Sequence, residues 1–535
     1  MSWNSSAAWA ACGGWDRDAV TTSEGSRIMQ PTRLIGSSRV RTIAAVAFVT
    51  CCLTLVHAAP GSAGGPRGKI RWHDCGGQSP SAVQCGEIAV PLDYRHPQRA
   101  KIRLGFNRLR AQDRAHRVGS LIVNPGGPGG AGSEVVAAEA GGAGLWHPAL
   151  HQRFDLIGMD PRGIGRSTPV RCQPAVYNRP VSLFPRSATD FGRLASYTRA
   201  LGRSCRRLTG PLLGHVDTLS VARDMEALRR ALGDGKLNFL GLSYGAEIGA
   251  LYAELHPNRI RTMALDGIFN HSISTDAVFA DSTAAYEDTI NRFAVWCAQA
   301  AECALHGTDV LALFDGLVRQ ADAQPIPVPQ CAPARCRTPV TSDDIRLNAY
   351  EQLLFKSPIS AFGAPGWNGF AQALAALASG DASAFAKPLV TSPRDGTFGG
   401  LAVNCVDFPP LIGGYDDLVS TSLLARTLAP RTQGASEAWP ALIGCMRWPA
   451  PLANPPHRAR IHGAPPILLA NATHDPSTPY RWAQNLLQQI PRAVLLTRDG
   501  DGHTSSLLHP SRTSDAIAHY LITRRTPHRN TVLPD

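Results

Sequence analysis

The feature that most constrains this chain is a serine set between two glycines, in Gly241-Leu242-Ser243-Tyr244-Gly245. Residues 236–240 are predicted to form a buried strand, and residues 246–255 are predicted to form a helix. A strand that turns straight into a helix through this pentapeptide bends so sharply that only small residues fit two positions either side of the serine. The turn lifts the hydroxyl above the sheet edge and aims the helix N-terminus at it. The pattern predicts a nucleophilic serine, and the alternative is a serine that only caps the helix.

An acid and a histidine follow two later predicted strands. Asp475 comes after the strand at 466–470, and His503 comes after the strand at 493–496. The order Ser, Asp, His along the chain is one of the known arrangements of a catalytic triad. We therefore expect Ser243 to attack a carbonyl carbon and His503 to accept and return the proton. Asp475 is expected to hold the imidazole in the required tautomer.

Neighbouring residues are rivals for both roles. His474 is the rival base, but it directly precedes Asp475 on one turn and could not easily face it. Asp499 and Asp501 are the rival acids, although they share a tight loop with His503 and are poorly placed to orient it. The sequence favours Asp475 and His503.

A glycine-rich loop, 124–132, follows the predicted strand 121–123. Backbone N–H groups of such a loop can approach a ligand closely, as an oxyanion hole requires. The loop also matches the dinucleotide-binding pattern Gly-x-Gly-x-x-Gly from Gly127 onward, with Asp160 at the end of the next strand. Pro128 argues against that alternative, because it removes an amide that would cradle a pyrophosphate. No lysine follows where a phosphate-binding P-loop needs one.

Taken together, these motifs resemble a known family, the secreted bacterial α/β-hydrolase peptidases. The family includes tripeptidyl aminopeptidases and proline iminopeptidase relatives with a TAP-like C-terminal region. The resemblance covers nearly everything from about Trp72 to Tyr520. It rests on the ordered motifs Gly126-Gly127-Pro128-Gly129, Asp160-Pro161-Arg162-Gly163, Gly241-x-Ser243-Tyr244-Gly245, Leu265-Asp266-Gly267, Val403-Asn404-Cys405-Val406-Asp407, Asp475-Pro476 and Gly502-His503.

The resemblance implies that the backbone N–H groups of Gly127 and Tyr244 form the oxyanion hole. Many proline iminopeptidases have a histidine before the paired glycines and a tryptophan after the serine. This chain has Pro125 and Tyr244 at those places, which favours the tripeptidyl branch. The resemblance implies no metal and no cofactor.

We expect an α/β-hydrolase fold with a mostly parallel central sheet and a large, mainly helical cap inserted after the sixth strand. We expect a non-mature segment at 1–58, with Met29 as the true start and 29–58 as the signal peptide. The first part of the hydrolase core is expected at 70–270 and the cap at 271–460. The C-terminal, TAP-like part of the core follows at 461–524, and 525–535 is expected to be a disordered tail.

Cysteine usage indicates an oxidising compartment. Three of the thirteen cysteines lie in the N-terminal stretch, and the other ten form an even set. Five disulfides would be improbable in a reducing cytosol. Many connectivities are possible, and proximity in the sequence suggests the pairs Cys75–Cys85, Cys172–Cys205, Cys297–Cys303, Cys331–Cys336 and Cys405–Cys445.

The N-terminal stretch has the pattern of a Sec-type signal peptide. Arg33, Arg39 and Arg41 precede an apolar run from 43 to 56, and Ala58 ends a small-residue cleavage site. The run is too short for a comfortable membrane span, so we expect a secreted or periplasmic protein without stable membrane insertion. The net charge of +12 comes from scattered basic residues without a basic run, so we expect no nucleic-acid partner.

An enzyme that counts residues from a peptide N-terminus needs a carboxylate to pair with the α-ammonium group. Of the several cap carboxylates we favour Asp407, because a disulfide at Cys405 would hold it rigidly. We expect an exported serine exopeptidase that releases short peptides, most simply tripeptides, from free N-termini of peptide substrates. One alternative is an exported carboxylesterase or other acyl hydrolase, because a triad alone does not distinguish an amide from an ester. A second is a non-catalytic binding protein on the same fold.

Overall fold

A ten-stranded sheet forms the centre of the computed structural model, which describes residues 70–77, 79–328, 331 and 335–535. The strand order is β1-β2-β3-β5-β4-β6-β7-β8-β9-β10. The pairs β1–β2, β2–β3 and β3–β5 are antiparallel. All neighbouring pairs from β5–β4 to β9–β10 in this order are parallel. The strands are β1 (His73–Asp74), β2 (Val83–Pro91), β3 (Lys101–Leu109), β4 (Gly119–Asn124), β5 (Phe154–Met159), β6 (Leu237–Leu242), β7 (Ile260–Asp266), β8 (Leu468–His474), β9 (Val494–Asp501) and β10 (Thr531–Pro534).

Helices cover both faces of this sheet. Along β4, Leu121 and Val123 pack with α1, α2 and α15, whereas Ile122 packs with α5 and α6 on the opposite face. Both faces of a parallel strand are therefore buried, which explains why β4 and β6 are almost continuously apolar. These flanking helices are α1 (Gly132–Ala140), α2 (Pro148–Arg153), α5 (Thr218–Leu232), α6 (Tyr244–Leu255), α14 (Tyr480–Leu487) and α15 (Arg512–Thr523).

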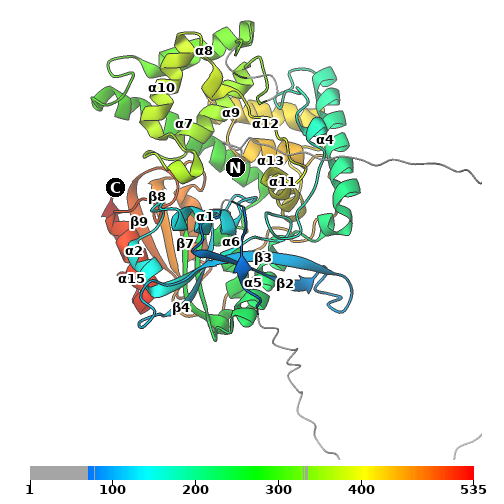
Figure 1. The fold of residues 1–535 in the computed structure, drawn as a ribbon. Coiled ribbons are helices and arrows are strands. Elements are labelled where there is room, and N and C mark those ends of the chain that lie inside the picture. The colour runs from blue at the N-terminus through cyan, green and yellow to red at the C-terminus, as the bar shows by residue number, and fades with distance from the viewer. Residues whose placement is uncertain (1–69, 78, 329–330, 332–334) are drawn as a thin grey trace, which may run out of the picture. The chain divides into compact units, whose positions relative to one another are not determined.

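A helical segment separates β7 from β8 in the chain and lies to one side of the sheet (Figure 1). It consists of α7 (Thr275–Gln299), α8 (Val310–Ala323), α9 (Ser342–Leu353), α10 (Gly366–Ala378), α11 (Gly396–Asp407), α12 (Tyr415–Leu428) and α13 (Ala438–Gly444). These helices fall inside the range 271–460 predicted for the cap. Short elements elsewhere are α3 (Pro174–Tyr177), η1 (Gly210–Gly214), η2 (Pro257–Arg259), η3 (Ser360–Phe362) and η4 (Ser383–Phe385).

Helix α4 (Ala188–Thr209) precedes the serine turn in the sequence but packs with the helical segment (Figure 1). Its Leu194 shares a buried cluster with Leu418 of α12 and Trp439 of α13. The ring of Phe184, just before α4, stacks on the Trp439 ring with centroids 5.3 Å apart. The helical layer is therefore built from two separate stretches of chain.

Two expectations about the chain's strands need correction. The two-residue β1 was not expected, so the helical segment follows the seventh strand, not the sixth. The stretch 525–535 was expected to be disordered, yet β10 pairs in parallel with β9. The carboxylate of Asp535 accepts hydrogen bonds from Arg498 and Lys356, which fastens this stretch to the sheet.

Five disulfides join the ten cysteines between residues 75 and 445. The pairs are those suggested by proximity in the sequence: Cys75–Cys85, Cys172–Cys205, Cys297–Cys303, Cys331–Cys336 and Cys405–Cys445. The predicted signal peptide lies outside the described residues. Within the described part of the chain, no helix combines the length and the apolar composition needed to span a membrane.

Candidate active site

Ser243 occupies the turn between β6 and α6, with backbone angles φ 57° and ψ −123°. A side chain at this φ is strained, so the surrounding structure must hold the turn. The flanking glycines are required by close contacts. A β-carbon on Gly241 would lie 2.3 Å from the Gly245 oxygen, and one on Gly245 would lie 2.8 Å from the Asn124 oxygen. The structure thus has the strand, the sharp turn and the helix that the sequence pattern predicted.

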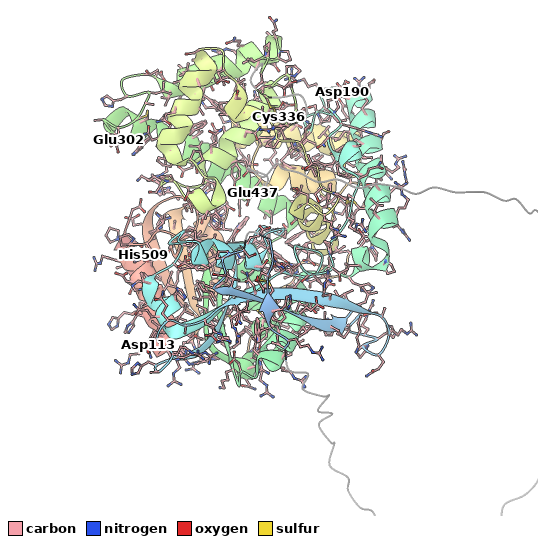
Figure 2. All side chains as sticks on the ribbon, viewed as in Figure 1. Asp113, Asp190, Glu302, Cys336, Glu437 and His509 are labelled. Carbon is pink, nitrogen blue, oxygen red and sulfur yellow. A yellow bond between two sulfur atoms is a disulfide. The ribbon has the colours of Figure 1, made fainter. Side chains whose placement is uncertain are left out.

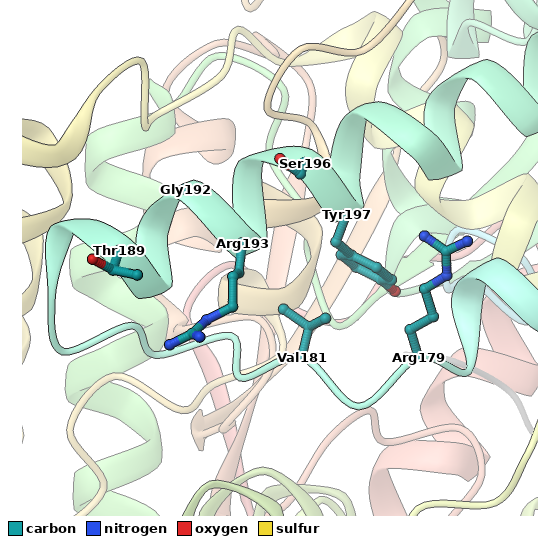
Figure 3. Close-up of a pocket in the computed structure, with 7 residues that line it drawn as sticks. All are labelled: Arg179, Val181, Thr189, Gly192, Arg193, Ser196 and Tyr197. Carbon is teal, nitrogen blue, oxygen red and sulfur yellow. The ribbon is translucent and has the colours of Figure 1, made fainter.

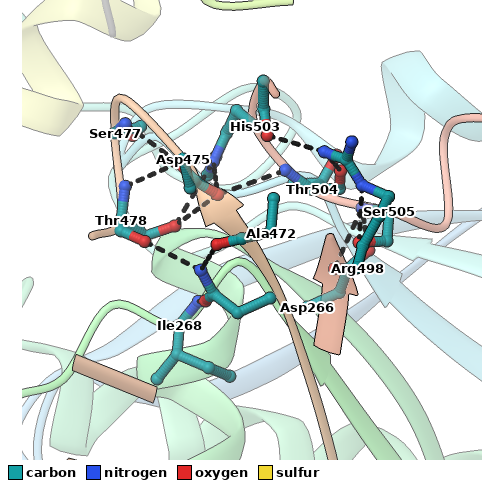
Figure 4. A network of polar contacts seen from close by, with 12 residues as sticks. Asp266, Ile268, Ala472, Asp475, Ser477, Thr478, Arg498, His503, Thr504 and Ser505 are labelled. Atoms are coloured by element: carbon teal, nitrogen blue, oxygen red, sulfur yellow. Dashed lines mark hydrogen bonds and ion pairs between the residues drawn. The ribbon is translucent and has the colours of Figure 1, made fainter. Parts of the chain in front are cut away.

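His503 and Asp475 lie together in a buried site, as predicted from the sequence (Figure 4). His503 Nδ1 is 2.9 Å from both carboxylate oxygens of Asp475. The carboxylate also accepts N–H bonds from Ser477 and Thr478 and the hydroxyl of Thr478. Burial lowers the pKa of His503, but the charge of Asp475 and their hydrogen bond raise it by more, so the pKa lies above its usual value.

The other ring nitrogen of His503 is not engaged by Asp475. His503 Nε2 is buried, and no group in the described residues, Ser243 included, hydrogen-bonds with it. The expected contact between the imidazole and the Ser243 hydroxyl is therefore not formed in this structure. Such contacts are often long in substrate-free enzymes and tighten when substrate binds. An unshared Nε2 lone pair is what a general base requires.

The end of β7 links Ser243 to the loop that carries His503. The Asp266 backbone oxygen accepts the Ser243 N–H at 2.9 Å. The Asp266 carboxylate accepts the N–H groups of Ser505 and Ser506, at 2.8 and 2.7 Å, and the Ser506 hydroxyl. The next residue, Gly267, touches the imidazole, since a β-carbon there would lie 2.9 Å from His503 Cε1. Sequence motifs singled out Asp266 without assigning it this role.

Arg498 holds the same loop through hydrogen bonds from its guanidinium (Figure 4). Its guanidinium is buried and donates to the backbone oxygens of Asp501, Gly502 and Thr504. Arg498 and Asp266 together thus hold five backbone groups of the His503 loop: three oxygens bonded by Arg498 and the N–H groups of Ser505 and Ser506 bonded by Asp266. This double support was not visible in the sequence, because Asp266 ends β7 and Arg498 lies in β9, more than 200 residues later.

The glycine-rich loop packs directly against the serine turn. A β-carbon on Gly126 would lie 2.7 Å from Ser243 Cβ and 3.2 Å from the Tyr244 nitrogen. Neither the Gly127 N–H nor the Tyr244 N–H has an acceptor among the residues that the structure describes. Two amide donors beside the serine hydroxyl are the arrangement that stabilises a developing oxyanion.

The rival residues have other partners. His474 Nδ1 contacts Asp288, Asp499 accepts the hydroxyl of Thr473, and Asp501 pairs with Arg292 and Lys356. Of these residues, none hydrogen-bonds to the His503 ring in the described structure.

The dinucleotide alternative is not supported by the position of Asp160. Its side chain is fully buried, and it accepts hydrogen bonds from the Ser133 N–H and hydroxyl and from the Arg166 N–H. Burial raises the pKa of Asp160 to about 6. A carboxylate enclosed in this way is not available to a ribose hydroxyl.

Asp407 is also enclosed. Its side chain is 1% exposed and accepts the N–H and the hydroxyl of Thr218. The Thr218 hydroxyl in turn contacts the Tyr244 hydroxyl at 2.7 Å. A substrate amine would have to displace Thr218 to reach this carboxylate, so the geometry does not suit the predicted role of amine anchor.

Glu437, which the sequence did not single out, lies closer to the triad. Figure 2 labels it between the helical segment and the strands. Its Oε1 accepts the Ser477 hydroxyl at 2.6 Å, and Ser477 is two residues from Asp475. Its charge is among the causes that raise the pKa of His503. Glu437 is therefore an acidic group of the helical segment within electrostatic reach of His503.

A surface groove lies elsewhere, along the start of α4 (Figure 3). Its lining contains none of the predicted triad residues and consists of Arg179, Val181, Thr189, Gly192, Arg193, Ser196 and Tyr197.

One group of side chains has the composition of a metal site. The ligand atoms of His147, His509 and Asp515 lie within 4.8 Å of one another. However, His147 Nδ1 accepts the Ala149 N–H, which puts the proton of the neutral ring on Nε2. That nitrogen lies 3.3 Å from the Asp515 carboxylate, and His509 Nδ1 contacts the Ser514 hydroxyl, so ligand atoms of the group already have protein partners.

Comparison with known proteins agrees with this geometry. Residues 119–510 match the model of the family described as alpha/beta hydrolase fold. The chain belongs to the α/β-hydrolase family. It is 31% identical to the serine protease Hip1 of Mycobacterium tuberculosis over 91% of this chain and 95% of that protein.

Two further relatives of this α/β hydrolase carry different names. One is a tripeptidyl aminopeptidase of Streptomyces lividans, 31% identical over 88% of each chain. The other is carboxylesterase B of Mycobacterium tuberculosis, 30% identical over 83% of this chain and 85% of that protein.

Proposed function

We propose that this α/β hydrolase is an exported serine exopeptidase that releases short peptides, most simply tripeptides, from free N-termini. The observation that carries the proposal is the buried His503–Asp475 pair beside the Ser243 turn, with Glu437 of the helical segment next to it. The relatives named serine protease and tripeptidyl aminopeptidase support peptides as substrates. Five disulfides and the predicted signal peptide support export.

The chemistry follows from the groups at the site. His503 Nε2 removes the proton from the Ser243 hydroxyl as its oxygen attacks the scissile carbonyl carbon. The negative charge that develops on the carbonyl oxygen is stabilised by the N–H groups of Gly127 and Tyr244. The C–N bond then breaks, His503 returns the proton to the leaving amine, and an acyl-enzyme remains on Ser243. Water, deprotonated by His503, attacks the carbonyl carbon of that ester, the bond to Ser243 Oγ breaks, His503 returns the proton to Oγ, and the peptide leaves as a free acid.

Glu437 replaces Asp407 as the proposed anchor for the substrate ammonium group. It is partly buried, it is held by Ser477, and it directly precedes α13 of the helical segment. An ammonium group that pairs with a partly buried carboxylate fixes how far the peptide enters. Removing either charge abolishes this pairing, which weakens the binding of blocked substrates.

The test is a panel of fluorogenic mono-, di- and tripeptides, free and N-acetylated, beside short-chain esters. N-acetylation should lower kcat/KM by about 100-fold or more. Glu437→Gln should lower kcat/KM on free peptides by a similar factor and cause little further loss on acetylated ones. Equal rates on free and blocked peptides would refute the exopeptidase proposal.

A second candidate is a carboxylesterase, which the relative named carboxylesterase B favours. A triad and an oxyanion hole act on esters as well as on amides. Turnover of short-chain esters with no turnover of any free peptide in the same panel would favour this candidate.

A further inference from the structure

Behind the serine turn, three buried side chains form a continuous row. The Tyr244 hydroxyl contacts Thr218 Oγ1 at 2.7 Å, and Asp407 accepts both the N–H and the hydroxyl of Thr218. The exposed fractions of these residues are 2% for Tyr244, 0% for Thr218 and 1% for Asp407. Burial shields these groups from bulk solvent, so each depends on its neighbour in the row.

The direction of the hydrogen bonds follows from the number of protons. The hydroxyl of Thr218 carries one proton, which it donates to the Asp407 carboxylate. Its oxygen must therefore accept from Tyr244, whose hydroxyl donates. Asp407 thus fixes the orientation of Thr218, and Thr218 fixes the ring of Tyr244.

The row joins separate parts of the fold at one point of the site. Tyr244 begins α6, Thr218 begins α5, and Asp407 ends α11 of the helical segment (Figure 1). The disulfide Cys405–Cys445 fastens the end of α11. The position of Asp407 is therefore set by the helical segment and not by the sheet.

We propose that Asp407 is a positioning residue of the oxyanion hole, acting through Thr218 on Tyr244. The inference rests on the proposed function, in which the Tyr244 N–H stabilises the oxyanion. The ring and the N–H belong to one residue, so the row limits rotation of the peptide group that carries the donor. A donor that is misplaced by a fraction of an ångström stabilises the transition state less while substrate binding is little affected.

The surroundings of Asp407 make a buried negative charge there unfavourable. Glu247 and Asp217 are buried nearby, and Glu247 pairs with His271 at 2.8 Å. Burial and the charges of Glu247 and Asp217 raise the pKa of Asp407 well above its usual value. A neutral side chain would relieve this repulsion, so Asp407→Asn should cost little stability while disturbing catalysis.

The experiment compares Asp407→Asn, Thr218→Val and Tyr244→Phe with the wild-type enzyme. An asparagine turns its amide oxygen to the Thr218 N–H and hydroxyl and accepts less strongly than a carboxylate, and Thr218→Val removes the hydroxyl that holds the Tyr244 ring. We expect kcat to fall about tenfold in each variant, with KM changed less than twofold. The inhibition constant of a peptidyl boronic acid, which mimics the tetrahedral intermediate, should rise in parallel with the loss of kcat/KM. Thr218→Ser keeps the hydroxyl and should retain nearly full kcat.

The chain offers a matched control in the helical segment. Glu287 accepts the N–H of Thr432 at 2.9 Å and its hydroxyl at 2.8 Å, the same bonds that Asp407 accepts from Thr218. Glu287→Gln and Thr432→Val should change melting temperature without raising the boronic acid inhibition constant.

The outcomes separate this inference from the proposed function. If the wild-type enzyme hydrolyses neither peptides nor esters, the proposed function fails. If it is active but Asp407→Asn and Thr218→Val match the Glu287 and Thr432 controls in kcat and boronate inhibition, the positioning inference alone is overturned. If Asp407→Asn instead raises KM for free peptides only, Asp407 is an amine anchor and the inference is also overturned.

Discussion

Replacing Asp266 with asparagine tests the link between the serine turn and the His503 loop. The Asp266 side chain is fully buried, and both of its carboxylate oxygens accept the Ser505 N–H, at 3.0 and 2.8 Å. Its Oδ2 also accepts the N–H and the hydroxyl of Ser506, each at 2.7 Å. Whichever way the new amide group is oriented, its NH₂ faces the Ser505 N–H, and a donor opposes a donor.

The cost can be worked out from these contacts. A hydrogen bond to a charged group contributes about 1.5–3 kcal/mol, and at least one such bond is lost. We therefore expect Asp266→Asn to lower the free energy of unfolding by about 2–3 kcal/mol. The loosened amides follow His503 in the chain, so kcat should fall about tenfold while KM changes little.

The assay is chemical denaturation together with peptide hydrolysis at a single pH. The control is Asp309→Asn, because Asp309 caps α8 in an exposed site by accepting one N–H, from Ala312. Its effect on unfolding should be about 1 kcal/mol or less, without loss of kcat. An Asp266→Asn enzyme with unchanged stability and unchanged kcat would refute the role assigned to Asp266.

Two other predictions concern titrating groups. Asp475→Asn should lower kcat about 10³-fold, which is a smaller loss than that caused by His503→Ala. It should also move the acid limb of the kcat/KM profile to lower pH, because the charge that raises the pKa of His503 is gone. An acid limb at the wild-type pH would contradict the assignment of Asp475. His271 is buried, which lowers its pKa, but Glu247 raises it by more, from 6.5 to about 9. The resulting stabilisation, about 3 kcal/mol, is complete below pH 6.5 and is lost as the pH rises through 9. Unfolding free energies measured between pH 6 and 10 should show this fall, and His271→Gln should flatten it.

The serine turn could be predicted from the sequence because its glycines are required by contacts within the turn and its immediate neighbours. Gly241 and Gly245 are needed wherever a strand meets a helix this closely, whatever the rest of the fold does. Asp475 and His503 were predictable for a related reason. Each follows a strand of a parallel sheet, and the carboxyl ends of such strands meet at one edge.

Other features depend on contacts between distant segments. The role of Asp266 requires two amides about 240 residues later in the chain, and the packing of α4 requires α12 and α13. An ion pair between Asp535 and Arg498 fastens the chain directly after β10. Nothing within the four residues of β10 itself indicates a strand. The sequence correctly placed Asp407 near a disulfide. It did not show whether the side chain faces substrate or Thr218, because that depends on how the helical segment packs.

The central claim is that Ser243 carries the peptide as an ester during turnover. A free tripeptide p-nitrophenyl ester is mixed with the enzyme, the reaction is quenched with acid within milliseconds, and the protein is digested and analysed by mass spectrometry. The account predicts one added tripeptidyl group on the fragment that contains Ser243, none in Ser243→Ala, and far less of it in the same time with the N-acetylated ester. A tripeptidyl group on another residue, or hydrolysis by Ser243→Ala at the wild-type rate, would contradict it.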